Sequence, residues 1–373
     1  MKIVIDSGIP YIKGVFEDAC DVIYMPGNLI KNEHLVDADA LIVRTRTKCN
    51  RELLEGTTVK IICSATIGYD HIDTEYCDEK SIEWHTVPGC NAGSVAQYVL
   101  SSIVLYCKNE KLLFNELKVG VIGYGNVGKM VVHYLHALGI KTLINDPVLQ
   151  EKDATFQSQS LDLLLDQSNV ISIHTPLTYS GSYPTYHLAN NDFFSAIKNN
   201  ALFINSSRGE VVDEEALLKM FLNNRKVSVV LDVWEHEPAI SKMLLDYCMI
   251  STPHIAGYSA DGKYNGTIGC IDKICTFFEI PSLISRANHP LPPQRSIIEV
   301  DALNRSKEDL FAEIIDSIYQ VSVDSFLLKE NFKNFEFIRN NYPNRREFKA
   351  YALKILGTPT FDTTPFFTLG FKS

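Results

Sequence analysis

Short apolar runs alternate with longer mixed stretches along the first 90 residues. Five of the runs have the length and the β-forming residues of strands, and the stretches between them have room for helices. Strands separated by helical stretches predict a parallel sheet. The expected strands are residues 2–5, 22–24, 40–44, 60–64 and 83–87.

A second series with the same alternation begins after a break at residues 87–91. Ser94 is expected to cap a long helix over residues 95–106, which leads into this series. The elements predict a doubly wound sheet, whose ligands lie at the carboxyl ends of the strands. The expected strands are residues 119–122, 141–145, 169–174, 201–205, 227–232 and 249–251, with helices at 161–166, 191–197 and 214–222.

The rest of the chain predicts a return to the first unit and then a third unit. Residues 261–278 have a helical pattern and are expected to pack on the first sheet. The prolines of residues 287–294 indicate a linker. Beyond it Ser306 opens a helix with a capping box, and residues 335–339 and 348–355 suggest more helix.

These patterns predict an α/β chain with three domains, because 373 residues are too many for one ordinary core. Two Rossmann-like domains with doubly wound parallel sheets would have a cleft between them, and a small α+β domain would follow. We expect a substrate domain from residues 1–95 and 256–285, a nucleotide-binding domain from 96–255, and the small C-terminal domain from 286–373.

A glycine motif follows the strand at residues 119–122, where Gly123, Gly125 and Gly128 form Gly-x-Gly-x-x-Gly before a helical pattern. The first glycine permits a tight turn, the second lets the backbone approach a pyrophosphate, and the third lets helix and strand pack closely. The free N–H groups at the helix start, around Asn126 and Val127, would face the phosphates. The motif therefore predicts dinucleotide binding.

Asp146 ends the next strand, roughly 20 residues further on, where a carboxylate should hold the ribose hydroxyls. Its charge would repel a 2′-phosphate. No arginine follows it directly, and the nearest base is Lys152. The sequence therefore favours NAD over NADP as the cofactor.

The composition narrows the set of partners. A formal net charge of −10 argues against nucleic-acid binding. No apolar run approaches the ~18 residues of a membrane span, so no membrane partner is expected. The nine cysteines are scattered, without a Cys-x-x-Cys pair or a metal-ligand spacing. This pattern indicates free thiols in a reducing cytoplasm and no metal site.

Oxidation of an alcohol by a dinucleotide needs a base for the hydroxyl proton and a cation for a carboxylate or the developing carbonyl, and a carboxylate that orients the base helps. Arg208, at a predicted strand end, can bind a carboxylate through two parallel hydrogen bonds. His254 suits proton exchange near neutral pH. Glu237 is the expected partner of His254, with Glu235 as its rival.

Several segments resemble the D-isomer-specific 2-hydroxyacid dehydrogenases, in the same order and over roughly residues 60–260. One departure is Gln97, where much of that family has an acidic residue. The matching segments are residues 66–73 (TIGYDHID), 87–92 (VPGCNA), 123–128 (GYGNVG), 174–178 (HTPLT), 205–213 (NSSRGEVVD), 232–238 (DVWEHEP) and 252–257 (TPHIAG).

This resemblance implies a role for particular residues. Arg208 would bind the substrate carboxylate, His254 would be the acid/base, and Glu237 would be its partner. Thr45 and Thr66 would contact the substrate. Besides the glycine loop and Asp146, the cofactor contacts would be Thr175, Ser206, Ser207, Arg208, Asp232, at the nicotinamide amide, and Gly257.

Three features resemble the branch of this family that oxidises 4-phospho-D-erythronate in vitamin B6 biosynthesis. The nucleotide domain begins early, Tyr258 follows Gly257 and could reach a phosphate, and residues 337–348 resemble a C-terminal dimerisation domain. The resemblance thus implies a small phosphorylated 2-hydroxy acid as substrate and a homodimer as the assembly.

Positively charged side chains that could bind such a phosphate lie within residues 43–48. In a strand, Arg44 and Arg46 share one face and Thr45 lies on the other, so both sets reach one ligand only if the chain is already turning. Arg345 and Arg346 could add charge from the tail, across a dimer.

Two other functions stay open. One is oxidation of another phosphorylated acid such as 3-phosphoglycerate, although the tail lacks the strand and glycine-turn pattern of a regulatory domain. The other is NAD sensing by a corepressor-like binding protein, which would keep the same catalytic trio. The aromatic, patterned tail disfavours this second function, because such corepressors usually end in a disordered extension.

Overall fold

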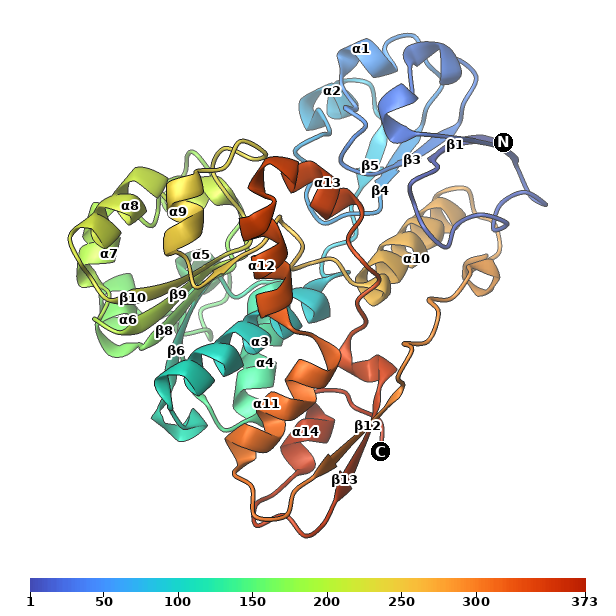
Figure 1. Cartoon of the computed structure of the whole chain (residues 1–373). Coiled ribbons are helices and arrows are strands. Elements are labelled where there is room, and N and C mark those ends of the chain that lie inside the picture. The colour runs from blue at the N-terminus through green and yellow to red at the C-terminus, as the bar shows by residue number, and fades with distance from the viewer. The chain divides into compact units, whose positions relative to one another are not determined.

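The computed structural model describes residues 1–373 and divides into two compact units. The first unit comprises residues 1–91 and 259–292, and the second comprises residues 92–258 and 293–373. Figure 1 shows the first unit in blue and light orange, and the second in cyan to yellow with the orange and red C-terminal segment.

The first unit is built on a five-stranded, all-parallel sheet in the order β2-β1-β3-β4-β5. Helix α10 packs on it through Ile271 and Ile274, which share one core with Ile3 and Ile5 of β1. Residues 261–278 therefore return to the first sheet, as the sequence predicts. The elements are β1 (Lys2–Asp6), β2 (Asp21–Met25), β3 (Ala40–Val43), α1 (Arg51–Leu54), β4 (Ile61–Ser64), α2 (Thr74–Glu79), β5 (Glu83–His85) and α10 (Ala260–Phe277).

The second unit contains a six-stranded parallel sheet in the order β11-β10-β9-β8-β6-β7. Its strands are β6 (Lys118–Ile122), β7 (Lys141–Asn145), β8 (Val170–Ile173), β9 (Ala201–Asn205), β10 (Val227–Leu231) and β11 (Ile250–Ser251). Its helices before the C-terminal segment are α3 (Ala92–Glu110), α4 (Asn126–Ala137), α5 (Pro147–Lys152), α6 (Leu161–Gln167), α7 (Asn191–Ala196), α8 (Glu214–Leu222) and α9 (Lys242–Tyr247).

Both faces of this sheet are buried, because side chains alternate between two cores along each central strand. In β9, Leu202 and Ile204 belong to the core beneath α3 and α4, whereas Phe203 belongs to the core beneath α6, α7 and α8. A parallel sheet covered on both faces needs such continuous apolar strands. The predicted α/β class with doubly wound parallel sheets is confirmed.

The C-terminal segment adds helices and a two-stranded parallel sheet to the second unit (Figure 1). Phe311 and Phe348 of this segment join the same core as α3 and α4. Its elements are β12 (Ile297–Asp301), α11 (Lys307–Ile318), α12 (Val321–Glu330), α13 (Phe335–Asn340), β13 (Ala352–Leu356) and α14 (Thr364–Thr368). Ser306 caps α11 as predicted, with its hydroxyl accepting from the Asp309 N–H at 3.0 Å.

The prediction of helix over residues 348–355 is wrong. A 3₁₀ turn at Phe348–Ala350 leads into strand β13, which pairs with β12 so that Leu353 lies opposite Ile298. Buried Tyr351 and Leu353 alternate with outward Lys354, which is the period of a strand. A run this short fits either period, and only its parallel partner decides between them.

Ser94 is not a helix cap, because α3 begins at Ala92 and carries Ser94 in its first turn. Its hydroxyl donates instead to the carbonyl oxygen of Ala256 at 2.9 Å. The predicted cap was a local interpretation of a serine whose partner lies 162 residues away.

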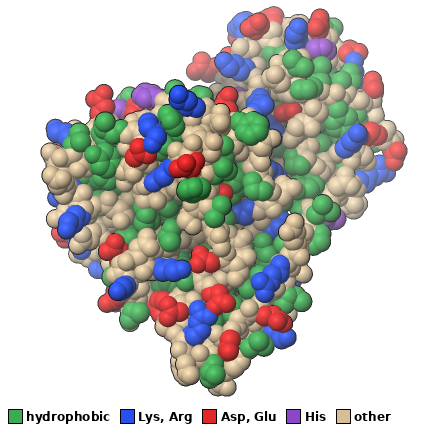
Figure 2. All heavy atoms as spheres, in the orientation of Figure 1, with side chains coloured by type: hydrophobic (Ala, Val, Ile, Leu, Met, Phe, Trp, Pro, Cys, Tyr) green, Lys and Arg blue, Asp and Glu red, His purple; other side chains and the backbone are tan.

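No helix in the chain combines the length and the apolar character that crossing a membrane requires. On the face shown in Figure 2, acidic and basic side chains are interspersed rather than gathered by sign.

Candidate active site

The turn between β6 and α4 is shaped by contacts that only glycine permits. Gly123 has a φ of +89°, and a Cβ there would lie 2.7 Å from the carbonyl oxygen of His174. A Cβ on Gly128 would collide with the carbonyl oxygen of Gly123. By contrast, a Cβ on Gly125 would meet nothing within 4 Å, and no side chain caps α4. Open space therefore lies before the free N–H groups of the helix start, as an anionic pyrophosphate requires.

Asp146 follows β7 and holds this turn in place. Its Oδ2 accepts from the Tyr124 N–H at 2.8 Å, and its Oδ1 accepts from the Leu149 N–H at 2.8 Å and so caps α5. Each carboxylate oxygen has a second lone pair. The carboxylate is thus fixed by two backbone donors beside the glycine turn, where it can still accept from ribose hydroxyls.

Several buried polar atoms along the same edge of the sheet have no partner within the chain. They are Oγ1 of Thr175, Oγ of Ser206 and Nδ1 of His174. Burial lowers the pKa of His174 to about 3, so its ring is neutral. Buried polar groups are rarely left without a hydrogen bond, so these atoms fit a polar cofactor such as NAD.

Asp232 lies at the end of β10 and is 1% exposed. Its carboxylate accepts from Thr252 Oγ1 and the Ile255 N–H, both at 2.7 Å, and from the Ala256 N–H at 2.8 Å. These bonds fix the loop after β11 that carries His254. The carboxylate predicted to meet the nicotinamide amide is thus already engaged with three donors of its own chain.

His254 stands on this loop with a φ of +58°, a left-handed conformation that costs a non-glycine residue of the order of 1–3 kcal/mol. Its Nδ1 lies 2.9 Å from Oε2 of Glu237, and Oε1 of Glu237 accepts from the Trp234 N–H at 3.0 Å. Glu235, the rival carboxylate, lies 2.7 Å from His187 Nε2 instead. The structure therefore brings Glu237, and not Glu235, to His254.

Burial acts to raise the pKa of Glu237, but the hydrogen bond and the charge of His254 outweigh it, with help from Arg339 and the backbone of Trp234. The net pKa lies below its usual range. Glu237 is therefore ionised at neutral pH, and it fixes the tautomer of His254 so that Nε2 is the nitrogen left for proton exchange.

Arg208 lies just beyond β9, the neighbour of β10 in the sheet. Its Nη1 donates to the Ser207 carbonyl oxygen at 2.9 Å. A Cβ on the following Gly209 would collide with the backbone of Trp234. This close approach packs the Arg208 loop against the beginning of the loop that holds Glu237.

Arg339 of α13 is a member of this cluster that sequence analysis missed. Its Nε donates to the hydroxyl of Tyr258 at 3.2 Å, and its Nη1 lies 3.6 Å from Oε2 of Glu237. The residue stands in the tail segment, for which the sequence suggests dimerisation and charge from Arg345 and Arg346 but no role for Arg339. Nothing in its spacing pointed to a partner 102 positions earlier in the chain.

The predicted substrate contacts of the first unit lie on two strand ends. The chain leaves β3 after Val43 and turns at once, so the strict alternation of a strand does not separate Thr45 from Arg44 and Arg46. Arg44 Nη1 donates to the Gly8 carbonyl oxygen at 3.2 Å.

Thr66 follows β4, where its Oγ1 lies 2.7 Å from Ser64 Oγ. Helix α10 adds a cation that the sequence did not single out. Burial, and then the charge of Arg44, lower the pKa of Lys263.

Arg345, considered above for a role across a dimer, is 7% exposed and directed into its own chain. Its Nη2 donates to Ser94 Oγ at 2.7 Å. Arg346, the other arginine considered, is half-buried.

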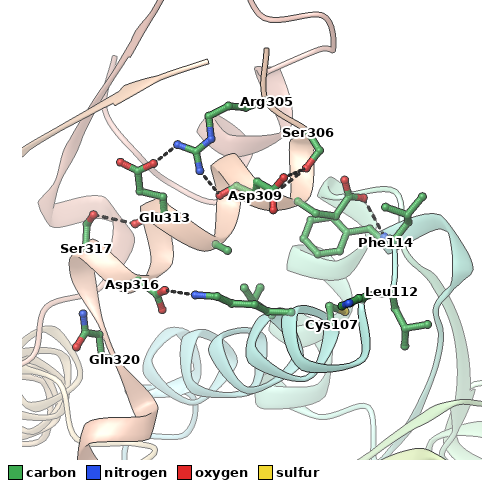
Figure 3. A pocket seen from close by; sticks show the side chains of 16 residues that line it. Cys107, Leu112, Phe114, Arg305, Ser306, Asp309, Glu313, Asp316, Ser317 and Gln320 are labelled. Carbon is green, nitrogen blue, oxygen red and sulfur yellow. Dashed lines mark hydrogen bonds and ion pairs between the residues drawn. The ribbon is translucent and has the colours of Figure 1, made fainter. Parts of the chain in front are cut away.

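A cavity of about 740 Å³ lies between α3 and α11, and it contains none of the predicted site residues (Figure 3). Lys108 of α3 and Asp316 of α11 form an ion pair of 3.4 Å across it, and Glu308 accepts from the Phe114 N–H. This cavity separates two helices and is not the catalytic site.

Comparison with known proteins agrees with this geometry. Residues 106–256 match the family model described as D-isomer specific 2-hydroxyacid dehydrogenase, NAD binding domain. An erythronate-4-phosphate dehydrogenase of Bacteroides thetaiotaomicron is 46% identical over 354 residues, which cover 95% of this chain and 99% of that protein. The enzyme of the same name from Proteus mirabilis is 37% identical, with 96% of each chain covered.

Solved structures show the same fold. The NAD⁺-bound 3-phosphoglycerate dehydrogenase of Entamoeba histolytica superposes with a TM-score of 0.63 at 27% identity, covering 75% of this chain and 95% of that one. The D-lactate dehydrogenase of Aquifex aeolicus, in complex with NAD and lactic acid, gives a TM-score of 0.60 at 27% identity, covering 74% and 95%.

Proposed function

The chain belongs to the D-isomer specific 2-hydroxyacid dehydrogenases, which makes it an NAD-dependent enzyme, and we propose that its substrate is 4-phospho-D-erythronate. The observation that carries this proposal is the similarity to erythronate-4-phosphate dehydrogenases over 95% of the chain. The solved dehydrogenases that act on other acids match only about three quarters of it.

The proposed reaction oxidises the C2 alcohol to a ketone and gives (R)-3-hydroxy-2-oxo-4-phosphooxybutanoate, a step of pyridoxal 5′-phosphate (vitamin B6) biosynthesis. His254 Nε2 takes the proton of the C2 hydroxyl, and Glu237 stabilises the imidazolium that forms. Arg208 binds the C1 carboxylate and fixes which face of C2 points to the cofactor. Bound NAD supplies the acceptor for the hydride that leaves C2.

NAD would be held by residues whose polar atoms have no partner in the chain, or whose backbone borders open space. The pyrophosphate would meet the N–H groups of Asn126 and Val127 beyond Gly125, and the ribose would meet Asp146. The unpartnered hydroxyls of Thr175 and Ser206 suit further contacts. Ser207, Asp232 and Gly257 complete the proposed cofactor set.

The substrate phosphate needs cations. Arg44 and Arg46 supply two, and Lys263 lies near Arg44, because burial and then the charge of Arg44 lower the pKa of Lys263. Cations held close to one another favour an anion between them. The hydroxyls of Thr45, Thr66 and Tyr258 would add donors for the phosphate and for the C3 hydroxyl.

The assembly that we propose is a homodimer in the cytoplasm. Helices α12 and α13 expose Phe326, at 67%, and Phe337, at 68%, and Figure 2 shows apolar side chains over both helices on one face. Such a patch is rarely left open to water. None of the nine cysteines forms a disulfide, which suits a reducing compartment. Phe326→Lys with Phe337→Lys should give a monomer by light scattering, whereas Tyr179→Lys, at another exposed aromatic, should not.

A panel of 2-hydroxy acids, with and without a terminal phosphate, tests the proposed substrate. NADH absorbance should rise fastest with 4-phospho-D-erythronate, with 3-phosphoglycerate and unphosphorylated erythronate well behind. Preference for 3-phosphoglycerate would replace the proposed substrate and leave the family unchanged. NAD binding without oxidation of any acid would favour a sensing function instead.

A further inference from the structure

The Glu237 carboxylate is approached by nitrogen atoms of two side chains at the same oxygen. His254 Nδ1 lies 2.9 Å from Oε2, and Arg339 Nη1 lies 3.6 Å from that atom. The side chains of Glu237 and Arg339 are 19% and 28% exposed, so the pair is only partly screened by water. The ring of His254 and the guanidinium of Arg339 therefore share one negative oxygen.

Arg339 is held in this position by a second contact. Its Nε donates to Tyr258 Oη at 3.2 Å, and the guanidinium lies 5.8 Å from the centre of the Tyr258 ring. A guanidinium can meet both groups at once because its donors form a rigid planar fork, which a lysine ammonium lacks. Arg339 thus links the partner of His254 to the tyrosine that follows the His254 loop.

We propose that Arg339 is a positioning residue for the dehydrogenase reaction, fixing the Glu237 carboxylate against His254 and the Tyr258 hydroxyl beside it. The inference rests on the proposed role of His254 as the base. A second cation at Oε2 also opposes the charge that His254 acquires, since like charges in proximity disfavour each other.

Other charged groups near Glu237 do not replace this effect. Glu214 of α8 lies near the loop that carries Glu237. The charges of Glu235, His236 and Glu237 on this loop all act on Glu214. Burial, followed by these acidic neighbours, raises the pKa of Glu214. Among these residues, only Arg339 carries a permanent positive charge toward Oε2 of Glu237.

Arg339→Met and Arg339→Lys test the proposal, with Glu336→Gln at an exposed position of α13 as the control. The enzyme is assayed with whichever 2-hydroxy acid it oxidises fastest, so failure of the proposed substrate does not remove the test. For Arg339→Met we expect kcat/KM to fall, and the acid limb of its pH profile to move up by about 0.5–1 pH unit. Glu336→Gln should behave as the unmodified enzyme.

Arg339→Lys keeps the charge but not the fork. It should restore the acid limb while the KM of the phosphorylated acid stays raised, because Tyr258 has lost its partner. Arg339→Met could lower the unfolding midpoint and leave the pH profile unchanged. That result would mean that Arg339 is merely structural and would overturn the proposal. If that variant does not fold, a lysine variant with the acid limb moved upward would overturn it equally.

A spectroscopic readout separates this inference from the proposed function. The imidazole ¹⁵N signals of His254, assigned by comparison with His254→Ala, can be titrated in the enzyme without substrate. The protonation midpoint should rise in Arg339→Met and stay unchanged in Arg339→Lys and Glu336→Gln. An unchanged midpoint in a folded Arg339→Met would sink the inference whatever acid the enzyme oxidises.

Discussion

Arg345 donates a hydrogen bond from Nη2 to the carbonyl oxygen of Ala256, at a distance of 2.5 Å. Ala256 stands two positions after His254, so the C-terminal segment holds the backbone of the His254 loop directly. The same nitrogen donates to Ser94 Oγ, and the guanidinium lies 4.1 Å from the ring centre of Tyr319. Arg345 of the C-terminal segment thus helps to fix the loop that carries His254.

Removing this buried cation should be costly. Arg345→Met strips the Ala256 carbonyl oxygen of a donor and removes the nearby charge that offsets half-buried Asp324, whose pKa is already raised by burial. Breaking a buried charged contact typically costs about 3–5 kcal/mol, which urea unfolding would measure. Arg305→Met, on the outside of α11 with Glu313 as its partner, should cost within about 1 kcal/mol. Equal losses would show that Arg345 is no more important than a surface arginine.

The two neighbouring carboxylates of the 232–238 loop should differ in their effect on turnover. Glu237→Gln leaves His254 without a charged partner, and we expect kcat to fall by about 10²–10⁴-fold, the usual share of a general base. Glu235→Gln breaks only the contact with His187 and should keep most of the activity. Initial rates of NADH formation measure both. Comparable rates for the two variants would remove Glu237 from its proposed role.

The fold was largely predictable because each strand of the two sheets carries a local signal. Residues 201–204 are all apolar, which is what burial on both faces of a parallel sheet requires, and the structure has the predicted strand at 201–205. Residues 348–355 had no such signal, because Leu353 and its neighbours become a strand only through pairing with residues 297–301. Local patterns do not contain that partner.

The candidate site divides in the same way. The sequence singles out His254 at a strand end and Glu237 on the loop after Asp232 because their residue types suit proton transfer, and the structure brings the two side chains together. Arg339 was missed, and Arg345 was considered only for a role across a dimer, because each reaches its partner across more than 80 residues and lies in a segment without a chemical motif. Ser94 was misjudged for the same reason. Its hydroxyl is satisfied by Ala256, not by its own helix.

Substitutions of Gly125 and Gly128, in the turn between β6 and α4, should have different effects. The first should weaken NAD binding, and the second should lower stability. A Cβ at Gly125 meets nothing within 4 Å, in the turn where the pyrophosphate is expected. Gly125→Ala should therefore fold normally but bind NAD about tenfold more weakly or worse, the equivalent of one lost hydrogen bond to a charged group. Titration calorimetry would measure the affinity.

Gly128→Ala is the contrasting variant, because its Cβ would collide with the backbone of Gly123. Backbone must then move, and we expect a lower unfolding midpoint even without cofactor. Stable Gly128→Ala protein, or an unstable Gly125→Ala, would contradict the assignment of the two positions.

His174 should make the protein sensitive to acid. Burial lowers its pKa from 6.5 to about 3, so the folded chain cannot take a proton at this ring where the unfolded chain can. Stability from this group is fully present above pH 6.5 and is lost as the pH falls toward 3, by up to about 1.4 kcal/mol per pH unit. Between pH 7.5 and 5.0 the loss integrates to about 2 kcal/mol.

His174→Gln, which cannot titrate, should lose that much less stability over the same range in urea unfolding, whereas His133→Gln, at an exposed position of α4, should follow the unmodified protein. Identical pH dependence in His174→Gln and the unmodified chain would mean that the ring is not held neutral, and the polar contact offered by its Nδ1 would need another explanation.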